Sequence, residues 1–124
     1  MPDAVAPDGS DIYFRVLDAE RASVVEVVLA AGRTSRAVRH KTVEEVWCFL
    51  AGSGDVWLGS PDGQTSQRRQ VGPGDFVVVR WGWAFQFRAT GTEPLRFLCF
   101  TSPPWPGEDE ALPVDEGGLG PPDF

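Results

Sequence analysis

Short apolar runs alternate with polar turns along most of the chain, and no stretch of helix length shows a 3.6-residue period. The runs are rich in β-branched and aromatic residues, and Gly, Pro, Asp and Ser separate them, which is typical of strands joined by tight turns. We expect strands at residues 12–17, 23–30, 35–40, 45–51, 55–59, 66–71, 75–80, 85–90 and 95–101. Their even spacing predicts an all-β sandwich or barrel with almost no helix.

The same pattern divides the 124 residues into three parts of a single domain. We expect a flexible N-terminal segment at residues 1–10, a β-barrel at residues 11–102 and a tail at residues 103–124. The tail is acidic and dense in Pro and Gly, so it cannot continue a sheet. It is expected to be extended, to pack over the barrel or a neighbouring subunit through Trp105, and then to fray.

Charge and composition narrow the range of partners. The formal net charge is −7, and an acidic chain is repelled by the phosphate backbone of nucleic acids. No apolar run reaches the length of about 18 residues that a transmembrane helix needs, and the N-terminus lacks the features of a signal peptide. We therefore expect a cytoplasmic protein with no nucleic-acid or membrane partner. Cys48 and Cys99 lie in apolar strands and are expected to be buried free thiols, whose redox role stays open.

Two segments combine polar residues and glycines in a recognisable order. His40 is followed by Glu45, and a glycine follows Glu45 after six intervening residues. Farther along, PGD ends at residue 75 and is followed by Gly82. Over roughly residues 24–101 this order resembles the two motifs of the cupin superfamily, and the phrase PPWPGEDEA in the tail resembles that of small bacterial cupins. The resemblance implies a cupin-type jelly roll, an antiparallel β-barrel of two facing sheets.

The metal-binding part of the motif is degenerate. A cupin metal centre has three histidines and one carboxylate, and the resemblance assigns His40 and Glu45 to two of these positions. Val38 and Phe85 stand where the other two histidines would be. Catalytic metal sites usually have three or more protein ligands. We therefore expect no metal and no other cofactor, and a divalent metal at His40 and Glu45 stays open as an alternative.

Strand alternation indicates which side chains line the barrel. If Glu45 points inward, Trp47 and Phe49 do too, and a phenylalanine in the histidine position makes Phe87 inward as well, while Gln86 faces outward. Two tryptophans flank the glycine at the strand entrance where cupin barrels open. The expected ligand-binding residues are Trp47, Phe49, Trp57, Trp81, Trp83, Phe85 and Phe87. Simple core packing is the other interpretation of such a row, and an aromatic pocket suits a small apolar or aromatic organic molecule.

Glu45 and His40 are the candidate catalytic residues. A carboxylate inside an aromatic barrel is costly to ionise unless His40 or an arginine pairs with it. Arg36, Arg39 and Arg80 are candidate cations for that role. A Glu–His pair in a cleft points to a functional site, and the alternative is a structural hydrogen-bonded pair that remains from an ancestral metal site.

Three functions are compatible with these residues. The first is a metal-independent enzyme of the isomerase, cyclase or lyase type, with His40 and Glu45 as general base and acid. The second is a ligand-binding or sensor protein without chemistry. The third is a metal-dependent cupin oxygenase with a reduced ligand set, which the metal content of the purified protein would distinguish from the other two.

The outward row of the glutamate strand predicts self-association. Val46, Cys48 and Leu50 alternate with the inward residues and are apolar. Exposed apolar patches of this kind usually mark an interface, and cupin barrels commonly cover the outer face of one sheet with a partner. We therefore expect a homodimer.

Overall fold

The computed structural model describes residues 1–124, apart from the side chain of Glu108. The strands are β1 (Ala4–Val5), β2 (Asp11–Val16), β3 (Ser23–Leu29), β4 (Val38–His40), β5 (Glu44–Ala51), β6 (Gly54–Gly59), β7 (Ser66–Val71), β8 (Phe76–Val79), β9 (Ala84–Ala89), β10 (Leu95–Ser102) and β11 (Ala111–Pro113). A single turn of 3-10 helix, η1 (Glu108–Glu110), precedes β11. All nine expected strands are present, and their bounds move by at most three residues. The described part of the chain contains no helix that is long and apolar enough to cross a membrane.

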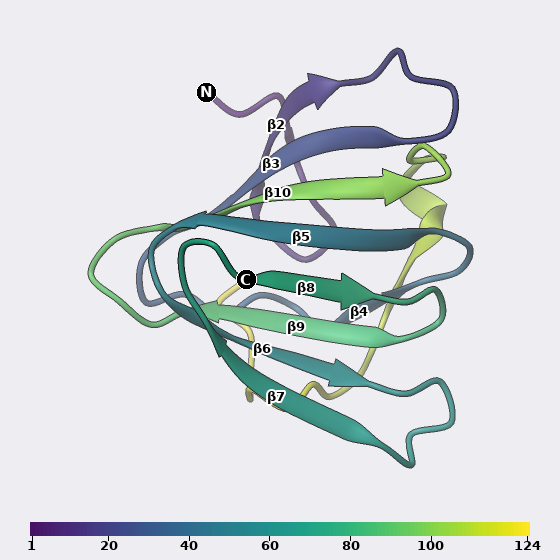
Figure 1. The fold of residues 1–124 in the computed structure, drawn as a ribbon. Helices are drawn as coiled ribbons and strands as arrows, with labels where there is room; N and C mark the ends of the chain where they lie inside the picture. Colours follow the sequence, from purple (N-terminus) through teal and green to yellow (C-terminus); the bar gives the residue numbers. More distant parts are fainter.

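Two antiparallel sheets form the barrel (Figure 1). The first has the strand order β1-β2-β3-β10-β5-β8, and the second has the order β11-β4-β9-β6-β7. Strands that are distant in sequence therefore become neighbours, and β10 pairs with both β3 and β5. The predicted all-β class and the jelly-roll arrangement are confirmed.

Inward residues of both sheets meet in one aromatic core, as period-2 alternation dictates. Trp47 and Phe97 come from the paired strands β5 and β10, and their rings stack with centroids 4.5 Å apart. Phe85 and Phe87 project from β9 in the opposite sheet and meet the Trp47 indole edge-on, at 5.2 and 5.4 Å. All four side chains are at most 2% exposed. The core is therefore filled by aromatic rings between the sheets.

The N-terminal segment at residues 1–10, which we expected to be flexible, forms part of the barrel wall instead. Ala4 pairs with Ile12 at the edge of the first sheet, and the Asp3 carboxylate accepts a hydrogen bond from the Phe14 N–H at 2.8 Å. Asp8 follows in a tight loop and is only 8% exposed. Sequence polarity alone did not reveal this arrangement, because the segment gains its partners only when β2 is in place.

The C-terminal tail packs over the outside of the second sheet and does not fray. Strand β11 pairs with β4, and the buried Leu119 donates its N–H to Gln86 at 2.8 Å. Gln86 faces outward as predicted, yet the tail leaves it only 1% exposed. The backbone N–H of Asp123 still bonds to the carbonyl of Thr34 at 3.0 Å. In Figure 1 the yellow end of the chain accordingly runs back along the barrel.

The outer face of the first sheet remains apolar and uncovered. Val46 pairs with Phe100 on one side and with Val78 on the other, and Cys48 pairs with Phe76. Phe76 is 58% exposed, and Phe100 and Val78 are each more than 40% exposed. This outer apolar face includes the row that predicted self-association. Cys48 lies on it half-buried, whereas Cys99 is buried on the inner side, and both thiols are free.

Candidate functional site

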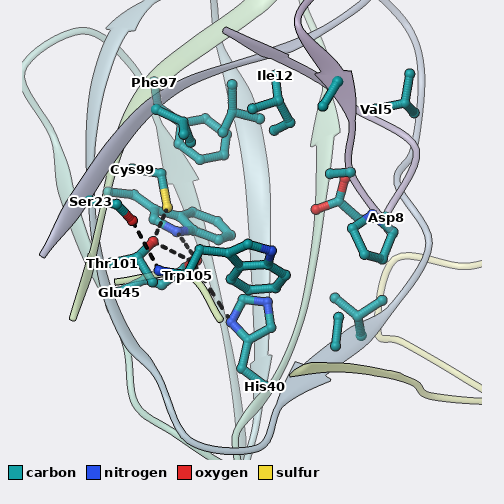
Figure 2. Close-up of a pocket in the computed structure, with 18 of the residues that line it drawn as sticks. Val5, Asp8, Ile12, Ser23, His40, Glu45, Phe97, Cys99, Thr101 and Trp105 are labelled. Carbon is teal, nitrogen blue, oxygen red and sulfur yellow. Dashed lines mark hydrogen bonds and ion pairs between the residues drawn. The ribbon is translucent and has the colours of Figure 1, made fainter. Parts of the chain in front are cut away.

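A cavity of about 240 Å³ lies inside the barrel, between the aromatic core and the N-terminal segment (Figure 2). Most of its wall is apolar and comes from both sheets, including Val25, Val27, Trp47, Phe85 and Phe97. The cavity exists because inward valines on β3 are smaller than the aromatic residues that fill the rest of the interior. Its position between the two sheets of the barrel is typical of small-molecule sites.

Glu45 is held rigidly at the polar end of this cavity. It is 5% exposed and lies directly across from Thr101 in the β5–β10 register. Its Oε1 accepts a hydrogen bond from the Trp47 Nε1–H at 3.0 Å, and its Oε2 accepts one from the Thr101 hydroxyl at 2.9 Å. Because both oxygens act as acceptors, the environment matches the ionised carboxylate.

His40 faces Glu45 without closing a hydrogen bond. Its Nδ1 lies 3.8 Å from Glu45 Oε2, beyond hydrogen-bond range. The side chain is buried, and no described group bonds to this nitrogen. The ring is held edge-on by Phe85 and Trp105, each with its centroid 5.0 Å away. Buried polar atoms are rarely left unpaired. His40 Nδ1 is therefore the atom of this wall to which a bound molecule would form a hydrogen bond.

Asp8 is a third polar group of the cavity, and the sequence analysis did not predict it. Its Oδ1 accepts hydrogen bonds from the N–H and the hydroxyl of Ser10, at 2.9 and 2.6 Å. Burial raises the pKa of the Asp8 carboxyl above its ordinary value, the Ser10 bonds oppose this, and the charge of Glu45 adds to the rise. The signal in the sequence was the Asp-Gly-Ser turn, since Asp side chains bond to the backbone two residues on.

Three residues complete the wall near Glu45. The Cys99 sulfur lies 3.6 Å from the Thr101 hydroxyl, and burial raises the pKa of the Cys99 thiol well above its ordinary value. A thiol that stays protonated is a poor nucleophile. Trp105 covers the cavity from the tail, with its backbone N–H donating to the Ser23 hydroxyl at 3.2 Å. The expected contact of the tail through Trp105 therefore falls at the cavity itself.

The seven expected ligand-binding aromatics are divided among three environments. Trp47 and Phe85 line the cavity. Phe49 and Phe87 are buried in the core beyond it, and Trp83 packs half-buried against that core.

The other two tryptophans lie elsewhere. Trp57 sits on the outer side of β6, because the inward positions there belong to Val56 and Leu58, and it lines a second pocket. Trp81 is 65% exposed, since it lies in the turn between β8 and β9 and the strand alternation does not apply to it. The structure therefore assigns neither tryptophan to the cavity.

None of the three candidate arginines lines the cavity among its described residues. The Arg36 guanidinium lies over the Phe124 ring, 5.7 Å from its centroid, and Arg39 lines the second pocket. Arg80 is exposed at the end of β8. His40 is therefore the basic group that faces Glu45.

The residues at this site do not fit a cupin metal centre. The two positions where the resemblance would place histidines hold Val38 and Phe85, which pair with each other across β4 and β9. Both side chains line the cavity as apolar wall. Among the described residues no group of three or more His, Cys, Asp and Glu side chains could hold a metal ion. His40 and Glu45 supply fewer donors than catalytic metal sites usually have.

Comparisons with known proteins agree with the fold. An uncharacterized protein of Methanocaldococcus jannaschii is 24% identical over 112 residues, which cover 87% of this chain and 85% of that protein. The oxalate decarboxylase of Lactobacillus farciminis, solved as a formate complex, superposes with a TM-score of 0.73 at 18% identity over 85% of this chain. The coconut allergen cocosin gives a TM-score of 0.70 at 18% identity over 82% of this chain.

The chain spans only 31% and 28% of those two solved structures, so they show the shared fold alone. A model of the cupin domain matches residues 25–101, which is more than half of the chain. That segment contains both glycine motifs, Glu45 and His40. The chain therefore belongs to the cupin domain family.

Proposed function

We propose that this cupin binds a small, largely apolar organic molecule in its cavity and catalyses a metal-independent proton transfer, of the isomerase, cyclase or lyase type. The observation that carries the proposal is the unpaired Nδ1 of His40, buried 3.8 Å from the fixed carboxylate of Glu45. General acid–base catalysis needs a proton acceptor that a substrate can reach and a group that stabilises it once charged. The two side chains supply both.

The surroundings give each residue a separate role. Glu45 already accepts hydrogen bonds from Trp47 and Thr101, which fix its position. No described group forms a hydrogen bond with His40 Nδ1, so His40 is the group that takes a proton from the substrate and returns it. The carboxylate stabilises the imidazolium formed in between, because opposite charges attract strongly at a water-poor site.

The dimensions and lining support the kind of ligand. A cavity of about 240 Å³ lies just below the usual range of roughly 300–1,000 Å³ for ligand pockets. The wall of valine, phenylalanine and tryptophan offers few hydrogen bonds to the body of the ligand. This favours a compact apolar or aromatic molecule with its polar part directed at His40.

The test is proton exchange in a metabolite extract. Protein purified without a His-tag is analysed for metal and incubated with the extract in D2O, and mass spectrometry follows compounds that change mass or gain deuterium. We expect less than one transition metal per chain and a conversion that a chelator does not stop. His40→Ala should slow it by about 10²-fold or more, Glu45→Gln should also slow it, and the exposed neighbour Glu44→Gln serves as the control.

Each other outcome assigns a different function. Loss of activity on chelation, with recovery after one metal is added, would indicate the oxygenase type of cupin. A compound that is retained but never converted would indicate a binding or sensor protein. A conversion that is unaffected by both His40→Ala and Glu45→Gln would show that the pair is not catalytic.

A further inference from the structure

The ionisable side chains of the cavity can all accept hydrogen bonds. Two of them are carboxyl groups, whose ionised form is negative, and no lysine or arginine lies among the described lining residues. Asp8, Glu45 and His40 are the ionisable side chains of the wall, besides the protonated thiol of Cys99. A neutral imidazole with its proton on Nε2 presents Nδ1 as an acceptor. An anionic ligand would therefore face two carboxyl groups and no fixed cation.

Asp8 lies across the cavity from Glu45. Figure 2 draws them on opposite sides, with the Trp105 indole and the His40 ring in view between them. Asp8 Oδ1 is occupied by Ser10, and no hydrogen bond of Oδ2 is found among the described residues. Asp8 lines the cavity and is 8% exposed, so Oδ2 is available to a molecule bound there.

Three acceptor atoms of the wall remain able to bind a ligand: Asp8 Oδ2, His40 Nδ1 and Glu45 Oε2, which already accepts one bond from Thr101 and can accept a second. Glu45 Oε2 and His40 Nδ1 are 3.8 Å apart, so one donor atom placed between them can lie within about 2.9 Å of both. The opposite wall adds the free oxygen of Asp8. A group with several N–H donors and a positive charge satisfies this arrangement, because charge-assisted hydrogen bonds are about twice as strong as neutral ones.

We propose that the ligand carries an amine, bound as an ammonium group between Asp8 on one side and Glu45 with His40 on the other, and that Asp8 determines this specificity. The proposal rests on the proposed function, since it names the chemical class of molecule that occupies the same cavity. The apolar body of the ligand then packs against Phe97, Val25 and the indole of Trp105.

The test compares three molecules that share one apolar body, namely 2-phenylethylamine, 2-phenylethanol and phenylacetate, by isothermal titration calorimetry. The amine should bind at least tenfold more tightly than the alcohol, and phenylacetate should bind most weakly. Asp8→Asn keeps an oxygen for the Ser10 bonds but loses the charge, so the advantage of the amine over the alcohol should fall at least tenfold. Asp11→Asn, which removes a carboxylate three residues farther on, at the start of β2 and outside the cavity lining, is the matched control and should leave the order unchanged.

The outcomes separate this inference from the function on which it rests. Equal binding of the three molecules, or tightest binding of phenylacetate, would overturn the inference and leave the cavity as a small-molecule site. An amine preference that survives Asp8→Asn would remove Asp8 as its determinant. Failure of all three molecules to bind would count against both the inference and the proposed ligand cavity.

Discussion

Trp105→Ala removes the indole that reaches the cavity from the C-terminal tail. Trp105 is 36% exposed, so nearly two-thirds of its surface is covered by the barrel. An enclosed aromatic side chain buries about 150–250 Å², which leaves about 100–160 Å² in contact for Trp105. Its edge-on contact with His40, with ring centroids 5.0 Å apart, places it beside the catalytic candidate.

The expected loss of ligand affinity follows from the area of the indole that the ligand covers. A ligand that lies against one face of the indole covers about 50 Å² of it, which is worth about 1.3 kcal/mol at 25 cal/mol per Å². Favourable aromatic geometry adds about 0.5–1.5 kcal/mol for a phenyl ligand. Trp105→Ala should therefore weaken binding by about tenfold to a hundredfold, since 1.4 kcal/mol corresponds to a factor of ten.

The assay is calorimetric titration of 2-phenylethylamine, with circular dichroism to confirm that each variant is folded. Trp81→Ala is the control, because Trp81 is 65% exposed and lies outside the cavity. It should bind like the unmodified chain. If Trp81→Ala weakens binding and Trp105→Ala does not, the ligand binds at the strand entrance and the assignment of the cavity is wrong.

Three further results are expected. Because burial raises the pKa of Asp8, the folded chain holds this proton more tightly than the unfolded chain, so stability should fall as pH rises from about 4 through the raised pKa. The free energy of unfolding of Asp8→Asn, measured with urea, should not show that fall. If it varies with pH in parallel with that of the unmodified chain, the expectation is contradicted. Val78→Asp, on the outer apolar face, should convert a homodimer into a monomer by light scattering, and an unmodified chain that is already monomeric would refute the dimer. Gln86→Leu removes three hydrogen bonds to Ser35, Leu119 and Gly120 and should lower the unfolding free energy by about 3 kcal/mol, whereas an effect below 1 kcal/mol would show that the tail does not depend on them.

The sequence predicted the barrel well because alternation and turns are local properties. Glu45 and Trp47 are two residues apart on one strand, so their common inward direction could be predicted before the fold was known. The glycine motifs likewise predicted that Phe85 points into the barrel, and it does so from β9, in the sheet opposite Glu45 and Trp47. The resemblance to cupins then implied the jelly-roll arrangement of two facing sheets, and the structure gives the pairing of strands that are far apart in sequence.

The parts of the site that were missed depend on contacts between distant segments. Asp8 is buried because its loop lies against the barrel, where its carbonyl accepts the N–H of Arg36 at 2.8 Å. Trp105 covers the cavity through a bond to Ser23, which is more than eighty positions earlier in the chain. Neither contact leaves a periodic signal in its own segment.

Two tryptophans were assigned to the cavity wrongly, because neither was placed by the alternation of an identified strand. Trp57 was grouped with the ligand-binding aromatics by residue type, although Val56 and Leu58 on either side of it are the inward residues. The alternation of the strand that holds Phe85 does not extend back to Trp81, which lies in the turn between β8 and β9. Tryptophans at strand ends can point to solvent, and only the strand boundaries decide the direction.

The central claim is that a small molecule binds inside the barrel beside His40 and Glu45. Labelling the five tryptophans with ¹⁵N gives five indole N–H signals in solution NMR, and replacing tryptophans one at a time with phenylalanine assigns them. On titration with 2-phenylethylamine the account predicts that the signal of Trp47, which donates to Glu45 at 3.0 Å, shifts together with that of Trp105. Shifts confined to Trp57 and Trp81, with Trp47 unchanged at saturation, would contradict it.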